Sequence, residues 1–173
     1  MIVVNVPVGN IHHDERLAAK LRRRKAADNC ELLHLSRTDM ERFRIRRNTD
    51  KGTDIIVVRQ GTAPLRNGDV LVDSKVKFVV VEQLPELVIS AAIKHVRNNK
   101  KAVEVAALIS HNIGNKHRPM AVRGGVIAFP AIAESELETF KQLAKPFKKY
   151  VRLTISRKPF EPNSLNAVQD HVE

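Results

Sequence analysis

The segment AVEVAALISHNIGNKHRPMAVRGGVIAF, residues 102–129, sets the fold class of this chain. Apolar residues in its first part recur at the spacing of one buried helical face; they are Ala102, Val105, Ala106, Ile109 and Ile113. Gly114 indicates that this helix ends in a left-handed turn. Two extended stretches, 119–123 and 126–129, flank the turn dipeptide Gly124-Gly125, so a β-hairpin is expected next.

The flanking residues extend this segment into a β-α-β-β-α-β pattern. The added elements are a strand at 86–93, a helix start capped by Asn98-Asn99, a second helix at 134–145 and a strand at 150–156. This order predicts a ferredoxin-like domain over residues 85–156. Residues 157–173 are rich in polar residues and proline, and are expected to form a flexible C-terminal tail.

Residues 1–84 predict a separate, β-rich domain. The expected elements are a strand at 2–8, a short basic helix or ordered loop at 12–27, a strand at 32–35, a hairpin made by ERFRIRRN, TDKG and TDIIVVRQ, a tight turn at Asn67-Gly68, and strands at 70–72 and 77–82. The predicted fold class is therefore α+β, with an N-terminal β-rich domain followed by a ferredoxin-like domain.

Composition limits the class of protein. Of the 173 residues 43% are apolar but only 4% are aromatic, which predicts an aliphatic core. No run of about 18 apolar residues occurs, so no membrane-spanning helix is expected, and the apolar start MIVVNVPVGN is expected to be a strand and not a signal peptide. The single Cys30 excludes an intramolecular disulfide and a thiolate zinc cluster. We expect a cytoplasmic protein.

The formal net charge of +11 favours an acidic partner, either nucleic acid or a protein with a negative face. Basic residues concentrate at 22–25 and between Arg42 and Arg47. Both runs have two interpretations, as solvated faces that protect edge strands from aggregation or as docking surfaces.

His117 is the residue of greatest functional interest, because it follows the expected helix end. Taken alone, an imidazole between Lys116 and Arg118 is more typical of a solvated surface residue, and both neighbours oppose a cation electrostatically. One histidine also cannot complete the shell of a divalent ion. A symmetric dimer would supply a second copy if His117 lay on the twofold axis.

Three motifs resemble one known family. The sequence IGNKH, after its helix, resembles the Gly-Asn-Arg/Lys-His signature of the urease accessory protein UreE family, which are nickel metallochaperones. PLRNGDVL resembles a segment of that family's N-terminal domain, and RNTDKGTDIIV resembles its hairpin. The resemblance covers essentially the whole chain, in the family's order of elements.

The resemblance implies a function for each part. Residues 1–84 would bind partner proteins, and residues 85–156 would bind metal and dimerise. Nickel (Ni²⁺), with Zn²⁺ or Cu²⁺ as alternatives at the same site, would be held by His117 and its symmetry mate and delivered to apo-urease during urease maturation. The implied partners are a second copy of the chain and urease assembly proteins, including the GTPase UreG; no membrane is implied.

The remaining histidines are weaker candidates for metal ligands than His117, or are expected to be structural. In the tail, His171 is a candidate auxiliary ligand, whereas His111 is a weaker candidate, expected instead at the helix surface or a dimer contact. The pair His12-His13 is not expected to bind metal, because adjacent side chains in a strand point to opposite faces. Structural roles are expected for His34 and His95, which lie in apparent strands.

The alternative function is RNA binding, because a basic ferredoxin-like domain is also the frame of RNA recognition motifs. Only Phe129 and Tyr150 lie near the expected sheet, and the aromatic RNA-binding signature is missing, so nucleic acid ranks second. No catalytic constellation or phosphate-binding loop occurs, and we expect no enzymatic turnover.

Overall fold

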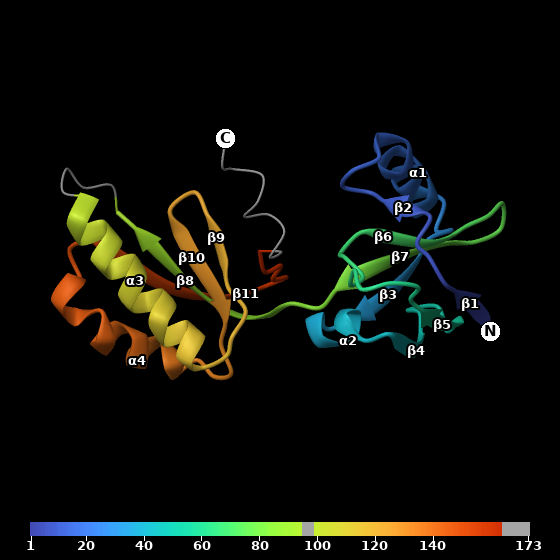
Figure 1. Ribbon diagram of the computed structural model, residues 1–173. Helices are drawn as coiled ribbons and strands as arrows, with labels where there is room; N and C mark the ends of the chain where they lie inside the picture. The colour runs from blue at the N-terminus through green and yellow to red at the C-terminus, as the bar shows by residue number, and fades with distance from the viewer. Residues whose placement is uncertain (95–98, 164–173) are drawn as a thin grey trace. The chain divides into compact units, whose positions relative to one another are not determined.

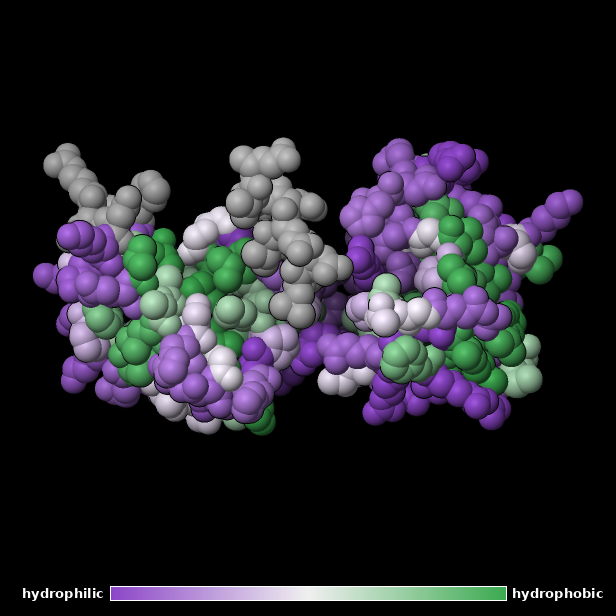
Figure 2. All heavy atoms as spheres, in the orientation of Figure 1, coloured by the Kyte–Doolittle hydropathy of each residue, from purple (hydrophilic) through white to green (hydrophobic). Residues whose placement is uncertain are grey.

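The computed structural model describes residues 1–94 and 99–163. The chain divides into two compact units, Met1–Leu84 and Pro85–Glu173 (Figure 1). Each unit combines helices with β-sheet, which confirms the predicted α+β class. Hydrophilic side chains cover most of the surface seen in Figure 2, with smaller apolar areas between them. None of the helices in the described residues is long and apolar enough to cross a membrane.

The second unit is a four-stranded sheet covered by two helices (Figure 1). Its elements in chain order are β8 (Glu86–Ile93), α3 (Asn99–Asn115), β9 (Ala121–Arg123), β10 (Val126–Pro130), α4 (Glu136–Leu143), a 3₁₀ turn (Lys145–Phe147) and β11 (Val151–Lys158). The strand order is β11-β8-β10-β9, and every neighbouring pair is antiparallel. The expected sequence of strands and helices is therefore present, and α3 and α4 pack against the same core.

The core of this unit lies between the sheet and its helices. On α3, Val105, Ile109 and Ile113 are at most 1% exposed, which confirms the predicted apolar face. They pack with residues of β8 and β10 and with Phe140 of α4, whose ring centroid lies 4.6 Å from that of Phe129. Burial of this stripe, more than helix propensity, holds α3 in place.

Two boundaries of the second unit differ from the prediction. The expected helix at 134–145 is shorter and passes into a 3₁₀ turn after Ala144, because Pro146 has no N–H and disfavours helical geometry in the residue before it. The final strand also continues beyond residue 156, to Lys158.

The segment 159–163, expected within a flexible tail, packs on the helix-free face of the sheet. Phe160 is 3% exposed and joins a small cluster with Val88 and Ala121. At the far edge, the backbone N–H of Asn163 donates to the Met120 carbonyl at 3.1 Å, and its side chain bonds the backbone of Val122. We call residues 159–163 the C-terminal strap; residues 164–173 lie outside the described part.

The first unit contains two sheets and two short helices. The three-stranded sheet has the order β1 (Ile2–Val4), β5 (Asp54–Val58), β4 (Arg44–Asn48). The four-stranded sheet has the order β2 (Gly9–Asn10), β6 (Asp69–Asp73), β7 (Phe78–Gln83), β3 (Glu31–Leu35). The helices are α1 (Glu15–Ala26) and α2 (Arg37–Glu41). The expected β4–β5 hairpin is confirmed, with Asn48 opposite Asp54.

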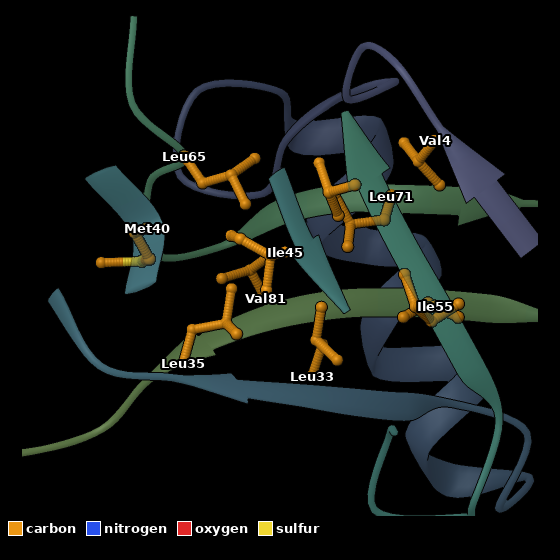
Figure 3. Close-up of a cluster of buried hydrophobic side chains, with 11 residues drawn as sticks. Val4, Leu33, Leu35, Met40, Ile45, Ile55, Leu65, Leu71 and Val81 are labelled. Carbon is orange, nitrogen blue, oxygen red and sulfur yellow. The ribbon is translucent and has the colours of Figure 1, made fainter. Parts of the chain in front are cut away.

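An aliphatic core joins the two sheets of the first unit, as its composition predicts. In Figure 3, Leu33, Leu35 and Val81 of one sheet point toward Ile45 and Ile55 of the other. All five of these residues are at most 4% exposed.

The first unit differs from the prediction at one strand and two helices. The strand predicted at 2–8 is broken after Val4, because Pro7 cannot donate a ladder hydrogen bond. The helix α2 was not predicted; the Ser36 hydroxyl caps it by accepting the Asp39 N–H at 3.1 Å. The helix expected near 12–27 begins at Glu15, where Asp14 provides the N-cap.

The buried stripe of α3 can be tested with two substitutions on the same helix. Replacing Ile109, 1% exposed, with Ala should lower the free energy of unfolding by about 2–5 kcal/mol, because it leaves a cavity. Replacing Val103, 66% exposed, with Ala should change it by less than about 0.5 kcal/mol. Urea denaturation followed by circular dichroism measures both; equal effects would contradict the assigned helix face.

Candidate metal centre

His117 forms part of the C-terminal cap of α3. Its backbone is left-handed, with φ 51°. Its N–H donates to the Gly114 carbonyl at 2.9 Å, and the N–H of Arg118 donates to the Ile113 carbonyl at 3.3 Å. These two bonds form a Schellman motif, in which the left-handed position is usually glycine. The imidazole therefore projects from a backbone that is tied to the last turn of α3.

The prediction that Gly114 ends the helix in a left-handed turn was wrong. Gly114 lies inside α3, which continues to Asn115. The capping bonds use the carbonyls of Ile113 and Gly114, so both residues must keep helical geometry. The left-handed residue therefore comes several positions after Ile113, the last buried residue of α3. In this chain the left-handed residue is His117.

The imidazole of His117 is exposed to solvent. Within residues 1–94 and 99–163, no three His, Cys, Asp or Glu side chains come together as a metal-binding group. His111, on the same helix, is also exposed, and its Nε2 lies 3.0 Å from the Asn115 amide nitrogen. A metal centre based on His117 therefore needs donors from water, from the C-terminal residues or from another chain.

Arg118 does not direct its charge at the neighbouring imidazole. Its guanidinium makes two hydrogen bonds to the Glu136 carboxylate, one of them at 2.7 Å, and a third to the Pro130 carbonyl at 3.2 Å. The side chains of Arg118 and Glu136 are 11% and 19% exposed. Hydrogen bonding to Arg118 lowers the pKa of Glu136, despite partial burial. The expected repulsion of a cation by Arg118 is thus compensated by Glu136.

The C-terminal strap returns the chain to the vicinity of His117. The backbone N–H of Asn163 donates to the carbonyl of Met120, which is three residues after His117. The side-chain amide of Asn163 also forms hydrogen bonds with the backbone of Val122. The strap therefore ends close to the candidate centre.

No family model matches the chain. It is 32% identical over 133 residues to the urease accessory protein UreE of Natronomonas pharaonis, covering 75% of this chain and 59% of that protein's length. It is 28% identical over 117 residues to the urease accessory protein UreE 1 of Pseudomonas syringae pv. tomato, covering 68% of this chain and 75% of that protein. The chain is thus similar to two urease accessory proteins named UreE, and the match spans less than two thirds of the length of the first.

The tetrad that carries the resemblance to UreE proteins has a structural role in this chain. Gly114 and Asn115 complete the last turn of α3, Lys116 follows it, and His117 takes the left-handed position. The tetrad is thus a helix cap that ends in an exposed imidazole. The sequence identified this residue but not its conformation.

The other described histidines, apart from His111, lie in the first unit. His34 is exposed on β3, and its Nε2 lies 2.7 Å from the Glu82 carboxylate on the adjacent strand β7. His12 and His13 lie in a turn before α1, so the argument from opposite strand faces was wrong for them. His95 and His171 lie outside the described residues.

Cys30 is buried, and desolvation raises the pKa of its thiol. A raised thiol pKa disfavours the thiolate, which is the nucleophile and the metal ligand. The buried thiol of Cys30 is therefore disfavoured as a nucleophile or a metal ligand.

The left-handed backbone of the α3 cap predicts an unusual stability series. His117→Gly should raise the free energy of unfolding by up to about 1 kcal/mol, because glycine adopts this conformation without a steric cost. His117→Val should lower it by about 1–3 kcal/mol, because a β-branched residue is strained there. Denaturant titration measures both variants, and a loss of similar size in each would argue against the cap.

The Arg118–Glu136 pair predicts acid sensitivity. Because its folded pKa is lowered, Glu136 contributes stability that is present above the ordinary value of 4.5 and is lost as pH falls through the folded pKa. Glu136→Gln should lower the free energy of unfolding by about 1–3 kcal/mol at pH 7. The difference from the unmodified protein should shrink below pH 4.5 in denaturant titrations at several pH values; a constant difference would contradict the assignment.

Proposed function

We propose that this chain is a nickel-binding metallochaperone that delivers Ni²⁺ to apo-urease during urease maturation. The observation that carries the proposal is an exposed imidazole on a fixed backbone, beside a guanidinium whose charge is compensated. The names of the two relatives support a role as a urease accessory protein. Such a carrier is not an enzyme, because it binds and releases an ion without chemical turnover.

We propose that the metal lies between two copies of the chain. One imidazole cannot fill the four to six positions that a divalent transition metal requires. A twofold axis near His117 would bring two imidazoles together, with water completing the shell. This arrangement suits a carrier, since few protein donors and open access to solvent favour release of the ion. Zn²⁺ and Cu²⁺ would compete for the same donors.

We assign the two units different roles. Residues 85–156 form the ferredoxin-like metal-binding and dimerisation domain; the β-α-β-β-α-β order and the β11-β8-β10-β9 sheet support this name. Residues 1–84 form the partner-binding domain, for urease assembly proteins including the GTPase UreG. We place the protein in the cytoplasm, and its single cysteine fits a reducing compartment.

His171 is proposed as an auxiliary ligand from the tail. It follows Asn163 by eight residues, and a chain of that length can reach about 27 Å from its anchor when extended. His117 lies within about 10 Å of Met120, to which Asn163 is bonded. The tail is therefore long enough to bring His171 to the metal. His111 is the less suitable ligand, since Asn115 contacts its ring nitrogen.

The RNA-binding alternative is not favoured. RNA recognition motifs stack bases on aromatic side chains of the open sheet face. Phe129 is fully buried and packs against α4, and Tyr150 packs against the same helix-side core. The two aromatic residues expected near the sheet therefore contribute to the core.

Titration calorimetry of Ni²⁺ into the protein and into His117→Gly tests the proposal. The unmodified protein should bind about one ion per dimer at its highest affinity. His117→Gly should lose this site while it keeps the helix cap, so the loss cannot be attributed to unfolding.

His117→Asn is a second matched variant, because asparagine also tolerates the left-handed conformation. His171→Ala should weaken the same site by a smaller factor, and His111→Ala should leave it unchanged. An isotherm for His117→Gly identical to that of the unmodified protein would refute the assigned site.

A further inference from the structure

An open groove runs between α4, the 3₁₀ turn and β11. Its floor is apolar and its rim is basic; the lining residues are Ala144, Val151 and Leu153, with Lys141, Lys145 and Lys148. Its volume of about 270 Å³ is small for a site that buries a small-molecule ligand. A groove of this size is better matched to side chains presented by another polypeptide.

The groove is lined mainly by a stretch of sequence without acidic residues. Between positions 139 and 160 the chain has no Asp or Glu and carries the basic residues Lys141, Lys145, Lys148, Lys149, Arg152, Arg157 and Lys158. Lys141 forms an ion pair with Glu138 at 2.6 Å. Lys145 and Lys148 are exposed, and neither forms an ion pair with any residue in the described part of the chain. The rim therefore keeps positive charge that is available to a partner.

The strand beside the groove has an available edge. Among the described residues β11 pairs only with β8, along all eight residues from Val151 to Lys158. The opposite edge of the sheet, at β9, is occupied by Asn163 of the strap. Unpaired backbone groups on an edge strand can accept an additional strand from another chain.

We propose that the groove binds an extended segment of a partner protein in which acidic and apolar residues alternate. The segment adds to β11 as a further strand through backbone hydrogen bonds. Because side chains alternate along a strand, one set can lie over the apolar floor at Val151 and Leu153. Carboxylates at its borders meet Lys145 and Lys148.

Other occupants fit these observations less well. A second copy of this chain would bring the same lysines together, and like charges oppose that contact. Single-stranded nucleic acid would meet the charges but would lack exposed aromatic side chains on which bases stack. The apolar floor has no use in binding a phosphate backbone. A strand in which acidic and apolar residues alternate would contact the apolar floor, the basic rim and the free edge of β11 at the same time.

This docking surface is independent of the proposed nickel site. The groove begins where β11 starts, and the Tyr150 carbonyl there accepts the N–H of Lys94, at the end of β8 that leads into α3. His117 follows the other end of α3, whose 17 residues span about 25 Å. A partner strand on β11 can therefore bind whether or not metal is present.

The test uses a fluorescein-labelled synthetic peptide in which Asp and Glu alternate with Val and Ile. Fluorescence anisotropy should show binding to the unmodified protein, and a loss of at least about tenfold in affinity for Lys145→Glu/Lys148→Glu. The matched control, Lys25→Glu/Lys75→Glu, makes the same change in net charge at exposed lysines of the first unit and should bind as the unmodified protein does.

Two further measurements separate the alternatives. Hydrogen exchange should slow at β11 amides when the peptide is bound, and a peptide of the same composition with acidic and apolar residues in separate blocks should bind less tightly. Equal loss in both double variants, or binding of polyuridine but not of the peptide, would overturn the proposal. The Ni²⁺ isotherm of Lys145→Glu/Lys148→Glu should stay unchanged, so failure here is distinguishable from failure of the nickel assignment.

Discussion

The two hydrogen bonds that cap α3 are the constraint on which the candidate centre depends. They join the N–H groups of His117 and Arg118 to the carbonyls of Gly114 and Ile113. Ile113 is fully buried in the core between α3 and the sheet. An exposed imidazole is thereby connected to the most rigid part of its unit through only a few bonds. Exposure and fixed position, which usually oppose each other in a surface residue, are combined here.

The chain after His117 is held as firmly as the helix before it. Arg118 bonds both Glu136 and the Pro130 carbonyl, at sequence separations of 18 and 12. The strap adds a bond from Asn163 to Met120. These contacts fix the candidate ligand without surrounding it, since the described residues bring no three His, Cys, Asp or Glu side chains together. In the proposed centre a second chain completes the shell, so metal binding and dimerisation would be coupled by mass action.

The sequence predicted features that depend on local periodicity. The apolar stripe through Val105, Ile109 and Ile113 predicted a helical face, and the alternation near Ile45 predicted a hairpin; both are confirmed. Periodicity could not locate the left-handed residue, because that position depends on which carbonyls accept the capping N–H groups. It also could not predict the Arg118–Glu136 pair or the position of Asn163, because each contact joins residues far apart in the chain.

The two edges of the second sheet show that the basic rim is more than protection against aggregation. Charged residues on an edge strand discourage uncontrolled pairing, and Arg157 and Lys158 of β11 fit that purpose. The β9 edge, however, is blocked directly by Asn163 of the same chain. If protection were the sole requirement at β11, charge alone would suffice, and an apolar floor at Val151 and Leu153 would weaken it. The basic residues of β11 disfavour pairing with most strands. The apolar groove beside it, with Lys145 and Lys148 free of ion pairs in the described part of the chain, favours pairing with strands of opposite charge.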